Sequence, residues 1–460
     1  MFKKFKHLHF VGIGGSGMSG IAEVLLNLGF QISGSDLKET DVTQHLQKLG
    51  ATFFLDHKSE NVIGADVVIT SSAIDLKNTE VQTAFNLKIP VIPRAEMLAE
   101  LARLKYAILI GGSHGKTTTT SMMALILGKA GFDPTVVIGG KFKNLGFGGK
   151  MGNGEYLVAE ADESDGSFLK LSPTMAIVTN IDNDHLDFYG TLDKIKSAFV
   201  QFINKIPFYG TAILCGDDPN IQSVLSEIHR HYLTYGFLSS NDYTAKNLIT
   251  KNLSTSFDVF FRNQLLGSVK LSTPGEQNAL NALAGISCGI ELGINFANIA
   301  EALSEFKGVS RRMEIKGEIN GVVFIDDYGH HPTEIKATLK AVRQTWPERR
   351  ILVAFQPHRY TRTALLWKEF GKVLMDSDVI KLLNIYPAGE KPIENISSSL
   401  IVNILQQNKK PAEIINMENS LDKLWKELQP GDIFLTLGAG DVWKLGEAMI
   451  ESKAGQDFFG

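Results

Sequence analysis

The sequence predicts an α/β protein of three domains: a Rossmann-like first domain, a central P-loop-type ATPase domain with a parallel sheet and a small antiparallel sheet, and a Rossmann-like third domain. Short apolar runs, each followed by a small-residue turn and a segment with helical spacing, recur along the chain, and this alternation is typical of parallel sheets. The 460 residues also exceed what one hydrophobic core usually supports. We place the domains at residues 1–104, 105–311 and 312–460.

The first domain opens on a strand at residues 7–11 that runs directly into a glycine-rich loop. Residues 12–17 fit the pattern G-x-G-x-x-G, and Asp36 lies 19 residues beyond Gly17. In such a loop, backbone N–H groups bind a pyrophosphate and the acid binds a ribose hydroxyl. Both NAD and a UDP-sugar carry these groups, so the loop alone allows an oxidoreductase or a UDP-sugar enzyme. The candidate ligand-binding residues are Gly14, Gly15, Ser16, Gly17, Asp36 and, after the predicted strand 66–70, Ser71 and Ser72.

The second domain opens on an apolar strand that leads into the stretch Gly112-Ser113-His114-Gly115-Lys116-Thr117. This is a P-loop of the form G-x-x-G-K-T, in which backbone N–H groups hold phosphates, the lysine adds charge, and the threonine hydroxyl reaches Mg²⁺. The helical spacing of 118–130 supports it. Ile110 stands where the longer loop has glycine, so we expect a shorter variant. A loop for ATP favours the UDP-sugar interpretation of the first domain, because hydride transfer needs no triphosphate.

Candidate metal ligands follow two further strands of the second domain. Glu160 ends the predicted strand 156–160, and His185 follows the strand that begins at 175. Because ligands gather beyond the carboxyl ends of parallel strands, Glu160 could hold Mg²⁺ together with Thr117, with His185 at a second metal. Other acidic residues crowd the same loops, so spacing alone does not favour Glu160 over its neighbours.

The rest of the chain completes the α/β pattern. Residues 231–272 alternate polar and apolar positions in short runs, which predicts the small antiparallel sheet. A helical segment follows at 278–291. The strand candidates of the third domain lie at 321–327, 350–355, 377–383 and 431–438.

Composition narrows the class of partner. The formal net charge of −4 gives no sign of a nucleic-acid surface. No apolar run approaches the ~20 residues that span a bilayer, and the N-terminus lacks a signal-peptide pattern. We therefore expect a cytoplasmic protein without a membrane or nucleic-acid partner. Cys215 and Cys288 are too few for a disulfide framework. A monomer and a homodimer both remain open.

Ten short stretches are spread in order over the three domains. They are GIGGSGMSGIAE (12–23), GSHGKTTTT (112–120), EADESDGSFL (160–169), NIDNDHLDFYG (180–190), NALNALA (278–284), RRMEIKGE (311–318), DDYGHHPTEI (326–335), FQPHRYTRT (355–363), YPAGE (386–390) and LGAGD (437–441). Together they resemble the Mur ligase family, the ATP-dependent amide-forming enzymes of peptidoglycan assembly. The resemblance covers essentially the whole chain and implies ATP and Mg²⁺ as cofactors.

The resemblance also implies roles for residues of the second domain. It implies that Gly112, Ser113, His114, Gly115, Lys116, Thr117 and Thr118 bind the ATP phosphates, that Thr117 and Glu160 hold one Mg²⁺ with His185 at a second metal position, and that Asn278 and Asn281 face the adenine. One departure lies beside them, since Gln277 stands where the family usually has histidine. We expect altered adenine contacts there and retained activity, because an amide still offers a donor and an acceptor.

In the third domain, the resemblance implies that Arg312 and Asp327 close over the nucleotide. The implied substrate-contacting residues, where the carboxylate and the amino acid meet, are Tyr328, His330, Arg359 and Arg362. His330 is a candidate base because imidazole titrates near working pH, although it could equally position substrate. The residues that we expect to take part in catalysis are Lys116, Arg312, Asp327 and His330. A regulatory nucleotide-binding protein would not need the third-domain residues.

Within the family, residues 326–334 and 356–363 together resemble the member that adds the first amino acid. This implies UDP-N-acetylmuramate and L-alanine as the substrates. A relative that attaches a recycled tripeptide to the same sugar nucleotide remains the alternative, and we expect it to differ around residues 355–363.

Overall fold

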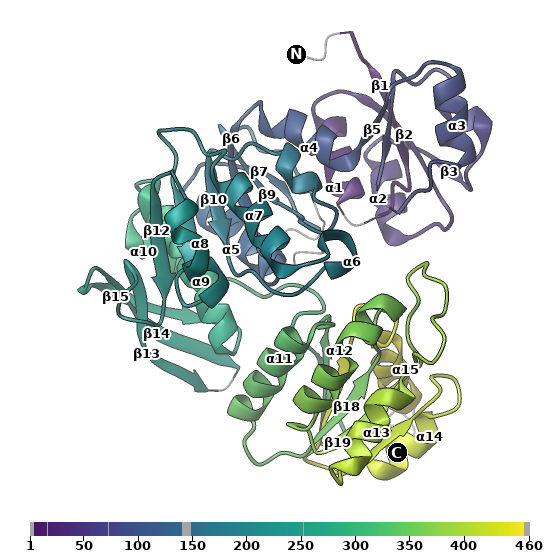
Figure 1. Ribbon diagram of the computed structural model, residues 1–460, viewed down its shortest axis with the longest axis vertical. Coiled ribbons are helices and arrows are strands. Elements are labelled where there is room, and N and C mark those ends of the chain that lie inside the picture. Colours follow the sequence, from purple (N-terminus) through teal and green to yellow (C-terminus); the bar gives the residue numbers. More distant parts are fainter. Residues whose placement is uncertain (1–3, 16, 72, 140–148, 252, 455–460) are drawn as a thin grey trace. The chain divides into compact units, whose positions relative to one another are not determined.

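The computed structural model describes residues 4–454 except 16, 72, 140–148 and 252 (Figure 1). Contacts divide the chain into two compact units. The second unit contains the residues from 310 onward with the short segments 249–255 and 273–277, and the first unit contains the rest.

The first sheet has five parallel strands in the order β3-β2-β1-β4-β5. The strands are β1 (His7–Val11), β2 (Gln31–Asp36), β3 (Thr52–Leu55), β4 (Val67–Thr70) and β5 (Val91–Pro93), and the helices are α1 (Met18–Asn27), α2 (Asp41–Lys48), α3 (Thr79–Asn86) and α4 (Arg94–Ala102). β1 lies between β2 and β4, with Leu8 opposite both Ile32 and Val67. The strand order reverses between β1 and β4, and ligands of open α/β sheets bind at such a point. The glycine loop after β1 and the loop after β4 therefore flank the expected binding crevice.

The second sheet has ten strands in the order β15-β14-β13-β12-β11-β10-β6-β9-β7-β8. The strands are β6 (Tyr106–Gly111), β7 (Thr135–Val137), β8 (Gly149–Lys150), β9 (Tyr156–Glu160), β10 (Met175–Val178), β11 (Ala212–Cys215), β12 (Tyr232–Gly236), β13 (Tyr243–Lys251), β14 (Ser254–Phe261) and β15 (Gln264–Leu271). β6 pairs in parallel with both β9 and β10, so the loops that follow these three strands meet at one edge. The segment 231–272, predicted as a small antiparallel sheet, forms β12, β13, β14 and β15 of this same sheet. The prediction is wrong for β12, which pairs in parallel with both β11 and β13. β14 and β15 are antiparallel, because a connection of only Arg262 and Asn263 joins them.

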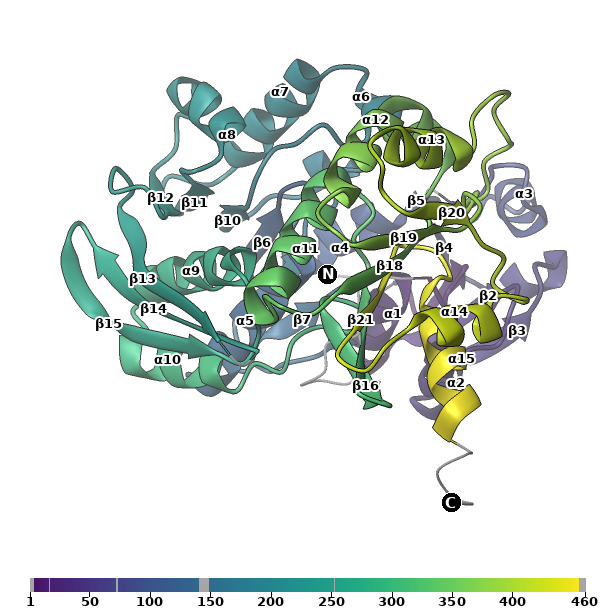
Figure 2. The same cartoon turned by 90° about the horizontal axis from the view of Figure 1, so that it is seen from below.

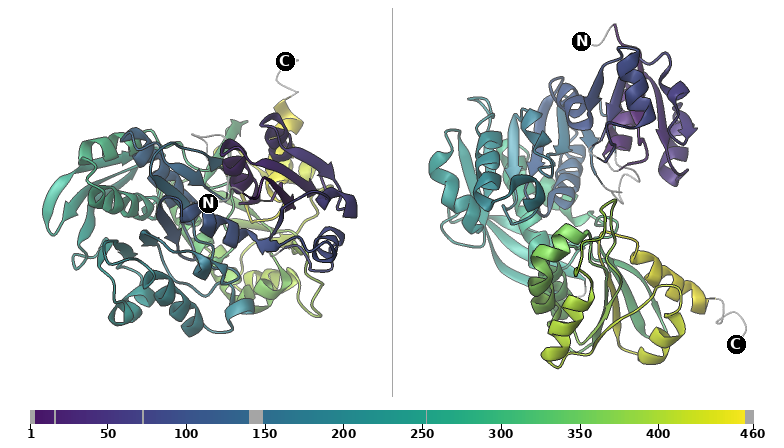
Figure 3. Two further views of the ribbon diagram at one scale, coloured as in Figure 1. Left: turned by 90° about the horizontal axis from the view of Figure 1, so that it is seen from above. Right: turned by 45° about the vertical axis from the view of Figure 1, so that its right-hand side comes forward.

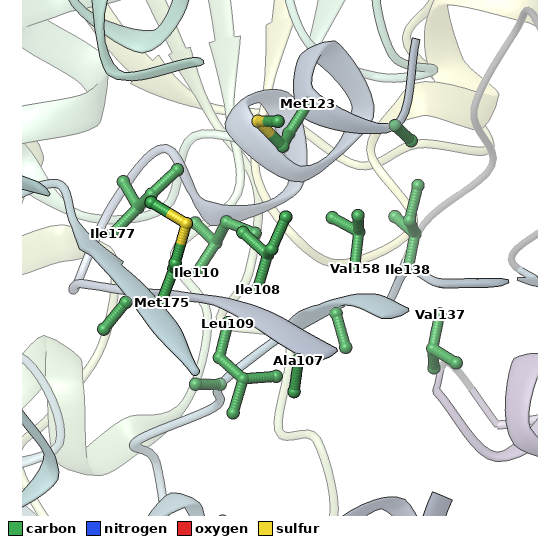
Figure 4. Packing of buried hydrophobic residues seen from close by; sticks show 14 of the residues in the cluster. Ala107, Ile108, Leu109, Ile110, Met123, Val137, Ile138, Val158, Met175 and Ile177 are labelled. Atoms are coloured by element: carbon green, nitrogen blue, oxygen red, sulfur yellow. The ribbon is translucent and has the colours of Figure 1, made fainter. Parts of the chain in front are cut away.

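Helices cover both faces of this sheet. They are α5 (Lys116–Lys129), α6 (Leu186–Tyr189), α7 (Leu192–Ile203), α8 (Pro219–Val224), α9 (Glu276–Glu291) and α10 (Phe296–Ser304). Figure 2 shows α7 and α8 on one face of β10, β11 and β12, with α5 and α9 on the other. Every residue of β6 after Tyr106 is buried. Ile108 and Ile110 point toward Met123 of α5, and Leu109 points to the opposite face (Figure 4). An apolar strand packed on both faces is the reason for the unbroken run Ala107–Ile110.

The third sheet has six strands in the order β16-β17-β21-β18-β19-β20, of which only β16 is antiparallel to its neighbour within the described pairs. The strands are β16 (Glu314–Ile319), β17 (Val322–Asp327), β18 (Ile351–Phe355), β19 (Val379–Leu382), β20 (Ala412–Ile414) and β21 (Ile433–Leu437), and the helices are α11 (Pro332–Thr345), α12 (Tyr360–Leu374), α13 (Ser399–Gln407), α14 (Leu421–Glu427) and α15 (Trp443–Ala454). Alternate strand residues pack on opposite faces: Ile325 against α11, α12 and α13, and Phe324 against α14 and α15. Figure 3 shows this sheet between its two helical layers.

The architecture confirms the predicted fold class, an α/β protein built on three sheets. Each sheet falls within one of the three predicted segments, while the boundaries near residues 104 and 311 stay predictions. In the part of the chain that the structure describes, no helix has both the length and the apolar character needed to cross a bilayer.

Candidate active site

The loop that the sequence predicts to bind phosphate, called the phosphate loop below, lies between β6 and α5, and two glycines shape it. Gly112 has φ +123° and Gly115, which directly precedes α5, has φ +84°. A Cβ at Gly112 would lie 2.1 Å from Oγ1 of Thr179, and one at Gly115 would lie 2.6 Å from Oδ1 of Asn281. Only glycine fits both positions without a shift of the surroundings. The loop is therefore packed closely against Thr179 and Asn281.

The residues after β10 brace this loop from the side. His114 donates its backbone N–H to Oδ1 of Asn180 at 2.8 Å, and its carbonyl accepts from Nδ2 of Asn180 at 3.0 Å and from the hydroxyl of Thr179. The imidazole of His114 lies 2.9 Å from a carboxylate oxygen of Asp182. The hydroxyl of Ser113 accepts from the backbone N–H of Asp182 at 2.9 Å. The sequence indicated that Asn180 and Asp182 follow a strand, but it gave them no role, because the loop residues that they contact lie more than sixty positions away.

Lys116, the first residue of α5, is held by a buried carboxylate. Its Nζ donates to the two carboxylate oxygens of Glu163 at 2.8 and 3.0 Å and to the carbonyl of Gly112 at 2.6 Å. Burial acts to lower the pKa of the Lys116 ammonium, but Glu163 and Asp162 outweigh burial and hold that pKa above its ordinary value. Lys116 is thus a permanent cation at the mouth of the loop, suited to anionic phosphates.

Two of the three predicted metal ligands come together beside this lysine. The hydroxyl of Thr117 bonds the carboxylate of Glu160, whose Oε1 also accepts from the backbone N–H of Gly139 at 2.9 Å. Burial raises the pKa of Glu160. A hydroxyl and a carboxylate are ligands that suit Mg²⁺, so these residues fit the predicted metal. The ring of His185 lies beside Asp184 instead, with its Nε2 3.6 Å from a carboxylate oxygen.

Asn281 and Asn278 share one face of α9, since three positions separate them. Oδ1 of Asn281 accepts from the hydroxyl of Thr119 at 3.2 Å, and the side chain lies against Gly115. Asn281 therefore contacts the start of α5. The roles of both asparagines toward adenine stay predictions.

The glycine loop of the first sheet is hydrogen-bonded to Asp36 at the end of β2. Oδ2 of Asp36 accepts from the backbone N–H of Gly14 at 3.0 Å, and Oδ1 accepts from that of Leu37 at 2.8 Å. Gly17 begins α1 with φ +79°. Gly15 lies in the turn between them, where its N–H donates to the carbonyl of Gly12 at 3.1 Å. Ser71 follows β4, the strand that pairs with β1, whereas Ser16 and Ser72 lie outside the described residues.

Arg94 was not singled out by the sequence, yet it lies against this loop. A Cβ at Gly17 would lie 2.7 Å from its Nη1, and its Nη2 lies 3.2 Å from Oδ2 of Asp162. Burial acts to raise the pKa of Asp162, but Lys116 and Arg94 hold that pKa below its ordinary value. A cation next to the start of α1 suits the pyrophosphate that the loop is expected to bind.

Asp327 and Arg312 lie together at the end of β17. The two carboxylate oxygens of Asp327 accept from the backbone N–H groups of Gly329 and Met313, each at 2.7 Å. Burial raises the pKa of Asp327 to about 6. The Arg312 guanidinium lies 5.2 Å from the ring centroid of Tyr328. Burial acts to lower the pKa of Arg312, but Glu334 and Asp327 hold that pKa above its ordinary value.

The remaining third-domain candidates gather after β17 and β18. The His330 ring lies 5.8 Å from the ring of His358, which stacks on Tyr386 at 5.6 Å. Nη1 of Arg362 lies 3.3 Å from Nδ1 of His358. Arg359 begins α12 with φ +69° and donates its backbone N–H to the carbonyl of Tyr386 at 2.9 Å. His358 and Tyr386 stand inside the quoted motifs, but nothing in their spacing indicated that they stack.

Comparison with protein-family models gives three matches along the chain. Residues 7–106 match a model described as "Mur ligase family, catalytic domain", residues 110–289 the "Mur ligase middle domain", and residues 311–440 the "Mur ligase, glutamate ligase domain". These matches cover most of the sequence.

Individual relatives are similar over the whole length. The UDP-N-acetylmuramate–L-alanine ligase of Endomicrobium trichonymphae is 54% identical over 450 residues, which are 98% of this chain and 99% of that protein. The enzyme of the same name from Geotalea uraniireducens (strain Rf4) is 53% identical over 457 residues, covering 99% of this chain and all of that one. Among solved structures, the UDP-N-acetylmuramate-alanine ligase from Thermotoga maritima is similar with a TM-score of 0.83 and 30% identity, covering 98% of this chain and 100% of that chain.

Proposed function

Since the chain belongs to the Mur ligase family, we propose that it is an ATP-dependent, ADP-forming ligase that joins L-alanine to the lactyl carboxylate of UDP-N-acetylmuramate. The reaction supplies a precursor of peptidoglycan, and we infer that it takes place in the cytoplasm. Full-length relatives more than half identical to this chain carry the name of this activity. The observation that carries the reaction class is Lys116, a partly buried cation that is the first residue of α5 and directly follows the glycine loop.

The first step transfers the γ-phosphoryl group of ATP to the lactyl carboxylate. A carboxylate oxygen attacks the phosphorus, the bond to the β-phosphate oxygen breaks, and an acyl phosphate and ADP form. The backbone N–H groups of the loop Gly112–Thr118 and the ammonium of Lys116 would stabilise the charge spread over the transferring group. Thr117 and Glu160 would hold Mg²⁺, which neutralises phosphate charge, and we assign a second metal position near His185. Asn278 and Asn281 would face the adenine.

The second step forms the amide bond. The amine of L-alanine attacks the acyl carbon, a proton leaves the nitrogen, and inorganic phosphate departs from the tetrahedral intermediate. We assign the third-domain residues to this step and to closure over the nucleotide: Arg312, Asp327, Tyr328, His330, Arg359 and Arg362. His330 would accept the amine proton, as imidazole does near neutral pH. The pyrophosphate of the sugar nucleotide would bind at Gly14, Gly15 and Gly17, with Asp36 and Ser71 beside them.

Phosphate release tests this function and separates it from its alternatives. The protein is incubated with ATP, Mg²⁺ and UDP-N-acetylmuramate, and L-alanine is compared with the tripeptide L-Ala-γ-D-Glu-meso-diaminopimelate. We expect release that depends on both the sugar nucleotide and L-alanine. Release with the tripeptide alone would replace the proposal by a recycling ligase. If neither amine causes phosphate release and the protein binds NADH, the first glycine loop would instead be that of an NAD-dependent oxidoreductase.

A further inference from the structure

Glu334, in the first turn of α11, has a buried carboxylate that contacts two residues assigned to the site. Its Oε1 accepts from Nη1 of Arg312 at 3.1 Å, and its Oε2 accepts from the backbone N–H of His330 at 3.0 Å. The same Oε2 lies 3.4 Å from Nδ1 of His330. The side chain is only 9% exposed. One carboxylate therefore joins the cation assigned to the nucleotide and the imidazole assigned to the amine.

The surroundings of Nδ1 decide which nitrogen of the His330 ring carries the proton. Nδ1 lies 3.2 Å from the carbonyl oxygen of Tyr328 and 3.4 Å from the carboxylate of Glu334. A carbonyl and a carboxylate can only accept hydrogen bonds. Nδ1 is therefore the protonated nitrogen, and Nε2 of the neutral ring is an acceptor. An acceptor at Nε2 is what a base needs to take a proton from an amine.

We propose that Glu334 is a positioning residue of the ligase, which fixes the guanidinium of Arg312 and keeps the ring of His330 in the Nδ1–H tautomer. The proposal rests on the proposed function, in which Arg312 serves the nucleotide and His330 the amine. Glu334 acts through these two residues and has no contact of its own with the reacting atoms in this scheme. The arrangement has the logic of a carboxylate that orients a catalytic histidine.

A capping role alone does not account for these contacts. Glu334 completes a capping box at the start of α11 with His331, whose backbone N–H lies 3.4 Å from Oε2. The contacts with Arg312 and with the His330 N–H are shorter, and both partners precede the helix. Glutamine also serves in a capping box, so the exchange Glu334→Gln separates the two roles.

The test compares Glu334→Gln with the unsubstituted protein. An amide oxygen of Gln at the position of Oε2 still accepts the backbone N–H of His330, while the NH₂ group beside it cannot accept from Arg312. The same oxygen still faces Nδ1 of His330, but as a neutral group it is a weaker acceptor than the carboxylate. With ¹⁵N-labelled histidine, we expect the neutral His330 ring to shift toward the Nε2–H tautomer, and His330→Asn identifies its signals. We expect kcat for alanine-dependent phosphate release to fall by at least about tenfold, with the KM for UDP-N-acetylmuramate unchanged.

Asp432→Asn is the matched control. Asp432 is also a buried acid that joins an arginine and a backbone N–H: it accepts from Nη2 of Arg350 at 2.6 Å and from the N–H of Gln429 at 2.8 Å. It precedes β21, which runs parallel to β17, so it lies at the edge of the sheet opposite Asp327. We expect Asp432→Asn to lower the melting temperature and to leave both kcat and the His330 signals unchanged.

Unchanged ¹⁵N shifts of His330 in Glu334→Gln would overturn the proposal, and so would a shift without a fall in kcat. An equal fall in kcat in Asp432→Asn would also overturn it, since a general loss of stability would then explain both. If the unsubstituted protein releases no phosphate with L-alanine, the proposed function fails. The tautomer measurement, which needs no turnover, then decides the positioning role by itself.

Discussion

The phosphate loop of the middle sheet and the residue cluster at the end of β17 are built in opposite ways. The loop is one contiguous stretch, 112–118, and its shape comes from hydrogen bonds to its backbone, such as that of His114 with Asn180, and from glycines that no other residue can replace. The third-domain cluster joins side chains from separate segments through ion pairs and ring contacts, such as Arg312 with Glu334 and His358 with Tyr386. A site made of backbone should tolerate most side-chain changes, whereas a site made of side chains should respond to conservative ones.

The largest expected effect is that of Lys116→Ala, because Lys116 supplies the positive charge of the loop. Removing the ammonium should lower kcat by at least about a hundredfold, with the fold retained. Phosphate release and circular dichroism measure the two quantities. Lys129→Ala is the control, since Lys129 ends the same helix in exposed pairs with Glu301 and Glu305. Near-normal turnover of Lys116→Ala would deny the loop its catalytic role.

Gly112→Ala tests the backbone of the loop directly. A Cβ there meets Thr179 and φ is +123°, so we expect a loss of stability of about 2 kcal/mol. The KM for ATP should rise about tenfold as the loop opens. Gly128→Ala, in open space within α5, should be neutral or slightly stabilising. Denaturant unfolding and ATP kinetics check both variants. If Gly112→Ala had the same stability and the same KM for ATP as Gly128→Ala, the shape of the loop would not depend on glycine at position 112.

Arg362→Lys tests the side-chain cluster with a change that keeps the charge. Lysine cannot reproduce the planar fork of the guanidinium, which lies beside His358. We expect the KM for L-alanine to rise several-fold, roughly fivefold, while the KM for ATP stays the same. Arg343→Lys, at the far end of α11 and paired with Asp378, is the control. If Arg362→Lys had normal kinetics for both substrates, the cluster would be less dependent on side-chain shape than the loop.

The smallest effect concerns Asp327 and pH. Burial raises its pKa from 3.8 to about 6, so the protonated form is the one favoured by folding. Its contribution to stability is therefore complete below the ordinary pKa and is lost as the pH rises through about 6. Between these values the melting temperature of the unsubstituted protein should fall relative to that of Asp327→Asn, and above them the difference should stay constant. A constant difference from pH 3.5 to 7.5 would contradict the raised pKa.

The sequence predicted those features that short stretches determine by themselves. Each glycine loop could be identified because its glycines, its lysine or acid, and the preceding apolar strand are neighbours in the chain. The parallel sheets followed from the alternation of apolar runs and turns. The order of strands, and with it the single ten-stranded sheet of the middle domain, depends on pairings between distant segments that no local pattern encodes.

The side-chain partners of the site were beyond such reasoning for the same reason. Glu334 is an ordinary first-turn acid in the sequence, and only the fold brings it to Arg312, which lies 22 positions away. Arg94 lies 68 positions from Asp162, its ion-pair partner. Asp36 was predicted by its spacing to face a ribose, and the structure binds it to the glycine loop itself. Contacts of this kind follow from the close approach of strand ends, which spacing along the chain does not record.

Because Lys116 is paired with Glu163, an anion that binds at the phosphate loop competes with this carboxylate for the ammonium. An anion that drew the ammonium away would leave behind a carboxylate that is 2% exposed, and this carboxylate would need other donors or stay uncompensated. The affinity of the loop is then the difference between two charge pairs. If the loop binds phosphate as proposed, such a difference would disfavour monovalent anions such as chloride and favour ligands that bring several negative charges.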